Sequence, residues 1–236
     1  MDDAERFDGV SGEEERAPGF RRRMFVRRRY HAPVTAALIV LCTVMALAER
    51  LQPQVGVEFM FYPPLAQAQH YRFITSAFLH SGFWHLVLNM YALWLLGRAL
   101  EPALGWARYL ALYFLSAIAG NAAVYAVANL TGGWNVGAVG ASGAIFGLFG
   151  ALMIMYRKVN ANMSGILVIL GINLVYGFVM PGISWESHVG GLLVGAFLMW
   201  LWLSIREGGQ GRRTRAFLDI ASGMAVLALT GLILWI

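Results

Sequence analysis

Seven stretches of mostly apolar residues alternate with short polar segments along the chain. We predict that they form membrane-spanning helices, because about 20 apolar helical residues match the thickness of a bilayer's hydrocarbon core. The predicted spans cover residues 32–51, 83–100, 106–128, 142–156, 165–179, 188–205 and 216–236. The connection over 52–82 is rich in large apolar residues, so we expect it to lie partly in the membrane interface.

The composition agrees with an all-α polytopic membrane protein. The chain has 236 residues, of which 58% are hydrophobic and 13% charged, whereas soluble domains carry about 25% charged residues. The positive charges flank the apolar stretches instead of forming a soluble basic module, so we expect no nucleic acid partner. The single cysteine, Cys42, excludes an intramolecular disulfide and a cysteine-based zinc cluster.

The charge distribution predicts an orientation. If the amino-terminal tail is cytoplasmic and the chain crosses seven times, only Arg50 and Arg72 of the 18 Lys and Arg fall outside. The positive-inside rule therefore predicts a cytoplasmic amino terminus and an external carboxyl terminus. Because nearly all these cations are arginines, which suggests a GC-rich genome, we expect a multi-pass protein of a bacterial plasma membrane.

Three segments follow from this pattern. Residues 1–31 are first acidic and then basic, and they hold few residues that could form a core, so we expect a disordered cytoplasmic tail. We interpret its arginines as a topology signal, with binding of anionic headgroups as the alternative. Residues 32–206 form the predicted six-span core, and 207–236 a basic linker with a seventh transmembrane helix.

Polar residues gather at the outer ends of three predicted spans. Ser142 opens the fourth span, His188 opens the sixth, and His85 and Asn89 lie near the start of the second. The fourth span is only about 22 Å long at ~1.5 Å per residue, so Ser142 lies below the outer membrane surface. Backbone at that depth must be buried in protein or line a wet cavity, and we expect all four residues to line such a cavity.

Two stripes of small residues predict how the fourth and sixth spans meet. The members are Gly140, Gly143, Gly147 and Gly150 on the fourth span, and Gly191 and Gly195 below His188 on the sixth. Such stripes let helix backbones approach closely in lipid. If the two stripes face each other, they bring Ser142 near His188; generic transmembrane packing is the alternative.

Ser142 and His188 together suggest nucleophilic catalysis. A serine hydroxyl needs a base within hydrogen-bond distance, and a histidine suits that role at neutral pH. No carboxylate lies at this depth on a span, because Glu186 falls in the preceding loop. We therefore predict a Ser–His dyad in which His188 is oriented by packing against Phe146, one turn below Ser142.

His85 and Asn89 lie four residues apart and so share a helix face. Together with the free N–H in the first turn of the fourth span they could form an oxyanion hole. The alternatives are a capping or interfacial histidine and an interhelical asparagine. A zinc site formed by His80, His85 and His188 would lack a carboxylate or cysteine ligand, so we expect no metal and no cofactor.

These motifs resemble those of the rhomboid family of intramembrane serine proteases. The family carries G-x-S-G on its fourth span, H-x-x-x-N on its second, and a histidine followed by G-x-x-x-G on its sixth. The matching residues here are Gly140-Ala141-Ser142-Gly143, His85 with Asn89, His188 with Gly191 and Gly195, and, in the loops, Arg72, Glu101 and Gly105. The resemblance covers about residues 33–206. Phe146 departs from it, because many members have tyrosine there, and Tyr71 stands where the family has tryptophan.

The resemblance implies a six-helix core with one added carboxyl-terminal helix, and it assigns Ser142 as nucleophile, His188 as base and His85 and Asn89 as oxyanion donors. It further implies cleavage of transmembrane segments of single-pass membrane proteins in the lipid bilayer. One alternative is a catalytically silent rhomboid-like protein that binds membrane clients, although such members usually lose the serine or the histidine.

A transporter is the second alternative. It would carry polar residues along the whole depth of its spans, whereas only Asn121 and Asn173 lie outside the outer layer. We interpret these two asparagines as forming interhelical hydrogen bonds. No oligomeric state follows from the sequence.

Overall fold

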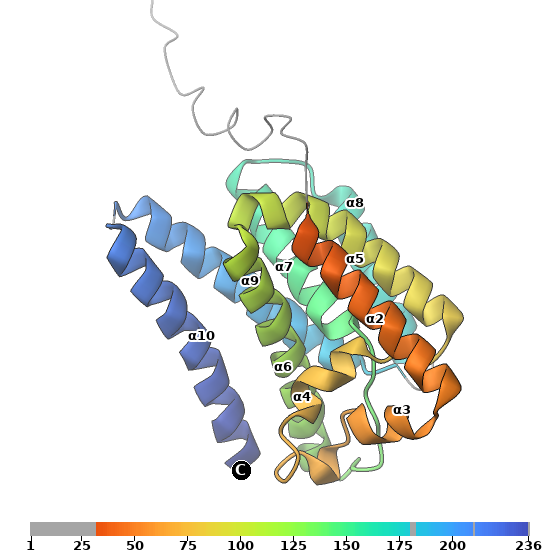
Figure 1. Ribbon diagram of the computed structural model, residues 1–236. Coiled ribbons are helices and arrows are strands. Elements are labelled where there is room, and N and C mark those ends of the chain that lie inside the picture. Colours follow the sequence, from red (N-terminus) through yellow and green to blue (C-terminus); the bar gives the residue numbers. More distant parts are fainter. Residues whose placement is uncertain (1–31, 180–182, 210, 236) are drawn as a thin grey trace, which may run out of the picture.

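The computed structural model describes residues 32–179, 183–209 and 211–235 as a bundle of helices (Figure 1). The helices are α2 (Pro33–Leu51), α3 (Gln54–Phe59), α4 (Arg72–Thr75), α5 (Phe83–Leu104), α6 (Trp106–Thr131), α7 (Ser142–Lys158), α8 (Ser164–Val179), α9 (Trp185–Glu207) and α10 (Arg212–Trp235), with short 3-10 turns at Pro63–Leu65 and Ser76–Phe78. The expectations for the amino-terminal tail concern residues 1–31, which lie outside the described residues.

Each predicted span corresponds to a helix, so the all-α polytopic class and the core of six helices plus one are confirmed. Among the described residues, four helices are long and apolar enough to cross a membrane, namely α2, α6, α9 and α10. The helices α7 and α8 are shorter, with 17 and 16 residues. Helix α9 begins three residues before the predicted start, so Glu186 lies in its first turn, and the expectation of a loop position was wrong.

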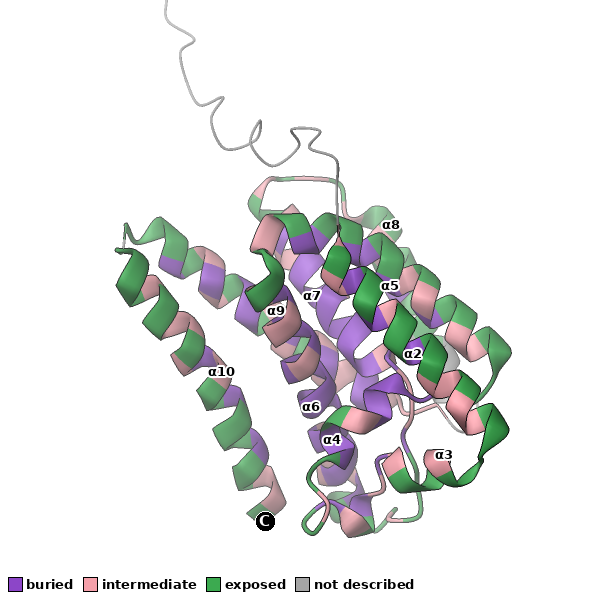
Figure 2. Ribbon diagram, viewed as in Figure 1, coloured by how far each residue is buried: buried purple, intermediate pink, exposed green. Residues whose placement is uncertain are grey.

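Helix α7 occupies the centre of the bundle. It packs against α5, α6 and α9, and most of its ribbon has the colour of buried residues in Figure 2, unlike the outer faces of α2 and α10. Its buried residues are small or apolar, including Ala144, Leu148 and Ala151. Because α7 is surrounded on several sides, the position of Ser142 at its first residue is fixed by the whole core.

The closest packing in the bundle lies between α7 and α9. A Cβ atom at Gly191 would overlap the carbonyl oxygen of Gly143, and one at Gly195 would overlap that of Gly147. The two backbones are therefore in direct contact, as expected where small residues face each other in a membrane protein. The prediction that the two glycine stripes face each other is confirmed.

The connection before α5 folds against the end of the bundle where α7 begins, and α3 and α4 lie there (Figure 1). Its large side chains Phe61, Phe73 and Leu79 are buried. Phe61 forms a β-bridge with Ala138 of the loop before α7. These buried side chains and the bridge pack the connection against the bundle and position the loop that leads to Ser142.

A carboxylate joins the first two long helices. The Glu101 side chain, on α5, accepts hydrogen bonds from the Val34 and Thr35 N–H groups at 3.0 and 2.8 Å and from Thr35 Oγ1 at 2.7 Å. Ala32 at the N-cap position of α2 makes no side-chain cap. The free N–H groups of the α2 terminus are thus satisfied by a residue of another helix.

Helix α10 stands at the edge of the bundle, beside α6 and α9 (Figure 1). It is tied to them by an ion pair between Arg108 and Asp219 and by a hydrogen bond of 3.1 Å from Trp202 Nε1 to Ser222 Oγ. These polar contacts attach the seventh helix to the six-helix core.

Candidate active site

A cavity of about 230 Å³ opens where α5, α7 and α9 begin. Its lining residues are Ser76, Ser81, Trp84, His85, Leu88, Asn121, Ala138, Val139, Gly140, Ser142, Ile183, Ser184 and Ser187. Five serine hydroxyls, an imidazole and a carboxamide give this wall a set of hydrogen-bonding groups among its apolar side chains. Such a wall can hold water and hydrogen-bond a peptide.

Ser142 lies at the first residue of α7, so its N–H has no intrahelical acceptor. Gly140, two residues earlier, has φ +123°, a conformation that strongly favours glycine. A Cβ atom there would lie 2.9 Å from His85 Nε2 and 3.6 Å from Ser142 Oγ. The glycine therefore permits the turn and leaves room for the imidazole beside the serine.

Hydrogen bonds define the tautomer of His85. The Ser81 N–H donates to His85 Nδ1 at 3.3 Å, and Ser81 Oγ lies 2.9 Å from the same nitrogen. A backbone N–H can only donate, so Nδ1 is the acceptor and the ring proton lies on Nε2. The nitrogen that faces the Gly140 turn is therefore a hydrogen-bond donor.

His188 stacks flat on Phe146, with ring centroids 4.1 Å apart and an interplanar angle of 5°. This contact is the one that the sequence predicted. His188 Nδ1 is buried and has no hydrogen-bond partner among the described residues. Among these described residues, no hydrogen bond joins the His188 ring to Ser142 Oγ. Packing, and no carboxylate, thus orients this imidazole.

The expectation that all four polar residues line the cavity was wrong for two of them. His85 and Ser142 line it, whereas Asn89 and His188 do not. Asn89 lies one turn further along α5, is buried, and donates from Nδ2 to the His85 carbonyl at 2.8 Å. His188 is only 6% exposed, and its neighbour Ser187 lines the wall instead.

Asn121 contributes to the site in a way that the sequence did not reveal. Its Nδ2 donates to the Phe73 carbonyl at 2.9 Å and to Ser76 Oγ at 2.8 Å, so it ties α6 to the connection beneath the cavity. The predicted interhelical role was wrong for Asn173, which is exposed and donates to Ile169 of its own helix. Only the tertiary structure distinguishes these two asparagines.

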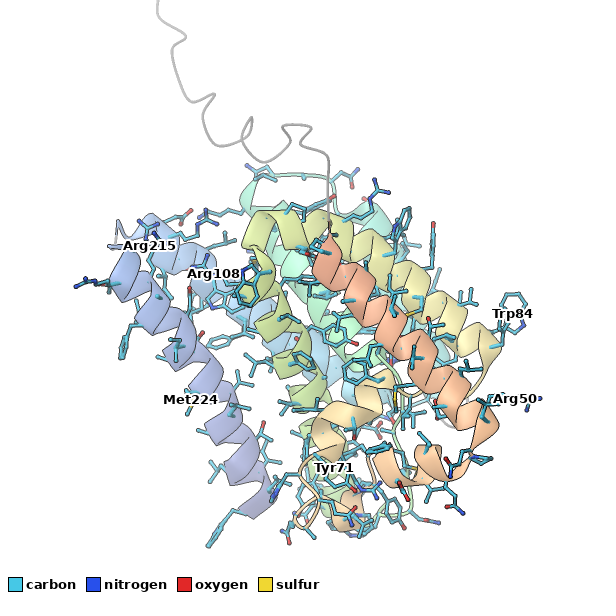
Figure 3. All side chains as sticks on the ribbon, in the orientation of Figure 1. Arg50, Tyr71, Trp84, Arg108, Arg215 and Met224 are labelled. Atoms are coloured by element: carbon cyan, nitrogen blue, oxygen red, sulfur yellow. The ribbon has the colours of Figure 1, made fainter. Side chains whose placement is uncertain are left out.

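Ser76, Trp84 and Ser187 also line the cavity, and none of them belongs to a motif in the sequence. For Ser187, the one sequence feature that could have indicated a place in the site was its position next to His188. Figure 3 shows Trp84 projecting at the edge of the bundle near this end. Among the described residues, no group of three or more His, Cys, Asp or Glu is placed to hold a metal ion.

Comparison with known proteins identifies the family of this architecture. The family model described as "Rhomboid domain" matches residues 67–205. The chain is 38% identical to "Rhomboid protease GluP" of Bacillus subtilis over 138 residues, which is 56% of this chain and 26% of that protein. It is 35% identical to "Putative rhomboid protease YdcA" of the same organism over 148 residues, covering 61% of this chain and 72% of that protein.

A plant relative is similar over a comparable length of the chain. "RHOMBOID-like protein 5" of Arabidopsis thaliana is 39% identical over 142 residues, or 56% of this chain and 44% of that protein. The match thus spans most of one bacterial relative, about a quarter of the other and less than half of the plant protein.

Proposed function

This chain belongs to the rhomboid family of intramembrane proteases, and from that premise we propose that it is a serine endopeptidase working through a Ser142–His188 dyad. Rhomboid proteases act on membrane proteins within the bilayer, and the apolar helices make this chain an integral membrane protein. Beyond family membership, we assign the catalytic residues and the substrate class of this chain.

The observation that carries the proposal is the contact between α7 and α9. Phe146, one turn below Ser142, stacks on His188, and the backbones of the two helices touch at Gly143 with Gly191 and at Gly147 with Gly195. This packing supports a serine and a histidine that act together at the start of both helices. No hydrogen bond joins them in the free state, and such bonds often tighten only when substrate binds.

In the first half of the reaction, Ser142 Oγ attacks the carbonyl carbon of the scissile peptide bond. The serine proton passes to His188, which then delivers it to the leaving amine as the C–N bond breaks. The amine product departs, and the other half of the substrate stays bound to Ser142 as an ester. The flat stack on Phe146 holds the ring in one plane through both transfers.

In the second half, water attacks the ester carbonyl. His188 takes a proton from that water and returns it to Ser142 Oγ, so the acid product leaves and the enzyme is restored. The hydroxyl-lined cavity supplies a path for water to a site that lies among apolar helices. The proposed role of the cavity is therefore to deliver the second reactant.

The oxyanion of each tetrahedral intermediate needs donors. We assign the Nε2–H of His85, whose tautomer is set by Ser81, and the free N–H of Ser142. The family resemblance also proposes Asn89 as a donor, although here it donates to the His85 carbonyl and does not line the cavity. Removing one such donor typically costs 10²–10³-fold in kcat, so His85→Ala is expected to lower kcat by about that factor.

The proposed substrates are single-pass membrane proteins whose transmembrane segment unwinds near small residues. A helical peptide bond has its N–H and C=O groups satisfied within the helix, so the segment must open before Ser142 can reach the carbonyl. The polar wall of the cavity can hydrogen-bond the unwound backbone. Cleavage at the outer face of a bacterial plasma membrane completes the proposal.

The test compares the purified parent with Ser142→Ala on a generic transmembrane substrate and with a fluorophosphonate label. We expect cleavage and labelling in the parent and neither in the variant, with losses of at least about 10³-fold. Ser204→Ala is the matched control, because this serine is exposed and hydrogen-bonds only its own helix.

A folded parent that binds the substrate but neither cleaves it nor takes the label would contradict the dyad. That result would favour the client-binding alternative. Labelling that persists in Ser142→Ala would mean that another serine is the nucleophile.

A further inference from the structure

A second cavity lies at the end of the bundle opposite the candidate active site, where α6 begins, α9 ends and α10 begins. Its volume is about 460 Å³, and it is lined by Arg108, Arg206, Arg212, Arg215, Ala216 and Asp219. Figure 3 shows Arg108 and Arg215 together at this end of the molecule. Arginines from three helices, α6, α9 and α10, thus line one hollow.

The cavity keeps an excess of positive charge. Asp219 Oδ2 accepts from Arg108 Nε at 2.9 Å and from Nη2 at 2.5 Å, so this carboxylate is already paired with one arginine. Glu207, at the end of α9, is paired with Lys158 at 2.7 Å. The lining thus holds four arginines and a single aspartate, which is paired with Arg108.

The cavity also lies at a border between polar and apolar surface. Along α10, exposed Phe217, Ile220 and Met224 follow directly after the arginines, and Met224 projects from the outer edge of α10 in Figure 3. A ligand that fits both parts carries a phosphate group and a hydrocarbon chain. Guanidinium groups donate paired hydrogen bonds to phosphate oxygens, and the exposed side chains match acyl chains.

We propose that this cavity binds the phosphate of an anionic phospholipid whose acyl chains lie along α10. Free phosphate would gain nothing from the apolar surface, and the cation of a zwitterionic headgroup would meet the excess of arginine charge. The bound headgroup would sit in the crevice at which α10 meets α6 and α9, where Arg108 and Asp219 already form an ion pair. The proposal does not depend on the proposed catalytic activity.

The experiment measures lipid binding to the purified full chain in neutral detergent by native mass spectrometry. Phosphatidylglycerol and phosphatidylcholine with the same acyl chains are compared. We expect about tenfold tighter binding of phosphatidylglycerol, and a loss of about fivefold in Arg206→Gln and in Arg212→Gln, because one arginine near an anionic lipid contributes about that factor.

Arg213→Gln is the matched control. It removes the same charge from the next residue of the same helix, but Arg213 does not line the cavity. We expect its affinity to stay within about twofold of the parent. Neither Arg206 nor Arg212 is buried, so both variants should fold, and equal thermal unfolding midpoints without lipid check this.

Three results would overturn the proposal. Equal affinity for the two lipids would remove the selectivity for an anionic headgroup. If Arg213→Gln lost as much affinity for phosphatidylglycerol as Arg206→Gln and Arg212→Gln, the binding would come from diffuse surface charge. Inorganic phosphate that displaces phosphatidylglycerol at an affinity equal to the lipid's would show a simple anion site, to which the acyl chains contribute nothing.

Discussion

At the scale of single residues, the candidate site depends on side chains held by packing and by backbone donors. Ser81 fixes the tautomer of His85, and the Phe146 ring fixes the plane of His188. Neither contact involves a carboxylate. Orientation by an apolar ring suits a site inside a membrane, since a buried, unpaired carboxylate would be costly there.

The stack on His188 can be tested with two substitutions at Phe146. We expect Phe146→Leu, which keeps an apolar side chain but removes the ring, to lower kcat about tenfold, since aromatic pairs contribute about 0.5–1.5 kcal/mol. Phe146→Tyr keeps the ring and should stay within about threefold. The measurement is the cleavage rate at saturating substrate, beside the unfolding midpoint of each variant. Equal rates in the two variants would show that the ring does not orient the base.

His80 predicts a pH dependence of stability. Burial, together with the nearby His85, lowers the pKa of His80 from 6.5 to about 4. The unfolded chain therefore binds a proton that the folded chain does not, and stability is lost as the pH falls from 6.5 toward 4. We expect His80 to account for about 2 kcal/mol of the loss between pH 7 and pH 5.

The measurement is the free energy of unfolding at both pH values, for the parent and for His80→Gln. The variant should lose less stability than the parent between pH 7 and pH 5. His70→Gln is the control, because His70 is exposed. An unchanged pH dependence in His80→Gln would contradict the assignment.

At the scale of elements, one helix pair determines the core. Helices α7 and α9 touch through backbone atoms at Gly143 with Gly191 and at Gly147 with Gly195. In lipid, such close contact replaces the hydrophobic driving force that packs soluble helices. The same contact places the first turns of both helices, and with them the candidate dyad, at one end of the bundle.

This packing predicts unequal effects of equal substitutions. We expect Gly195→Ala to destabilise the protein by about 2–3 kcal/mol, because its methyl group would overlap the Gly147 carbonyl. In Gly171→Ala, on α8, the methyl group would meet no atom within 4 Å, so stability should be unchanged or slightly increased. Reversible unfolding in mixed detergent measures both, and equal destabilisation would contradict the contact.

At the scale of the whole molecule, the two ends of the bundle differ in chemistry. One end carries the hydroxyl-lined cavity and the packed connection. The other carries the arginine-lined cavity. By the positive-inside rule we predict that the arginine end is cytoplasmic and the serine end external.

The orientation can be tested by cysteine labelling in intact bacterial cells, in a Cys42→Ala background. Thr131→Cys lies at the end of α6 near the serine cavity, and Asn162→Cys lies in the loop between α7 and α8; both positions are outside the core. We expect a membrane-impermeant maleimide to label Thr131→Cys in intact cells and Asn162→Cys only after permeabilisation. The reverse pattern would invert the predicted topology.

The sequence by itself determined the class, the seven helical segments and the facing glycine stripes. Each depends on a local or periodic property: apolar length, the charge of the flanks, and the spacing of small residues. The stack of His188 on Phe146 followed from the same periodicity, since Phe146 lies one turn below Ser142. The sequence also showed a glycine at position 140. It did not show why a glycine is needed there, which is that the residue has a positive φ and lies beside His85.

The tertiary structure alone decided which polar groups reach the cavity. Asn89 and Asn173 bond within their own helices, whereas Asn121 reaches across to the connection. Ser187 lines the cavity, whereas the predicted His188 does not. These outcomes depend on the rotation of each helix about its axis and on the path of the connection. Both are set by contacts between distant residues, which the pattern of a single helix does not encode.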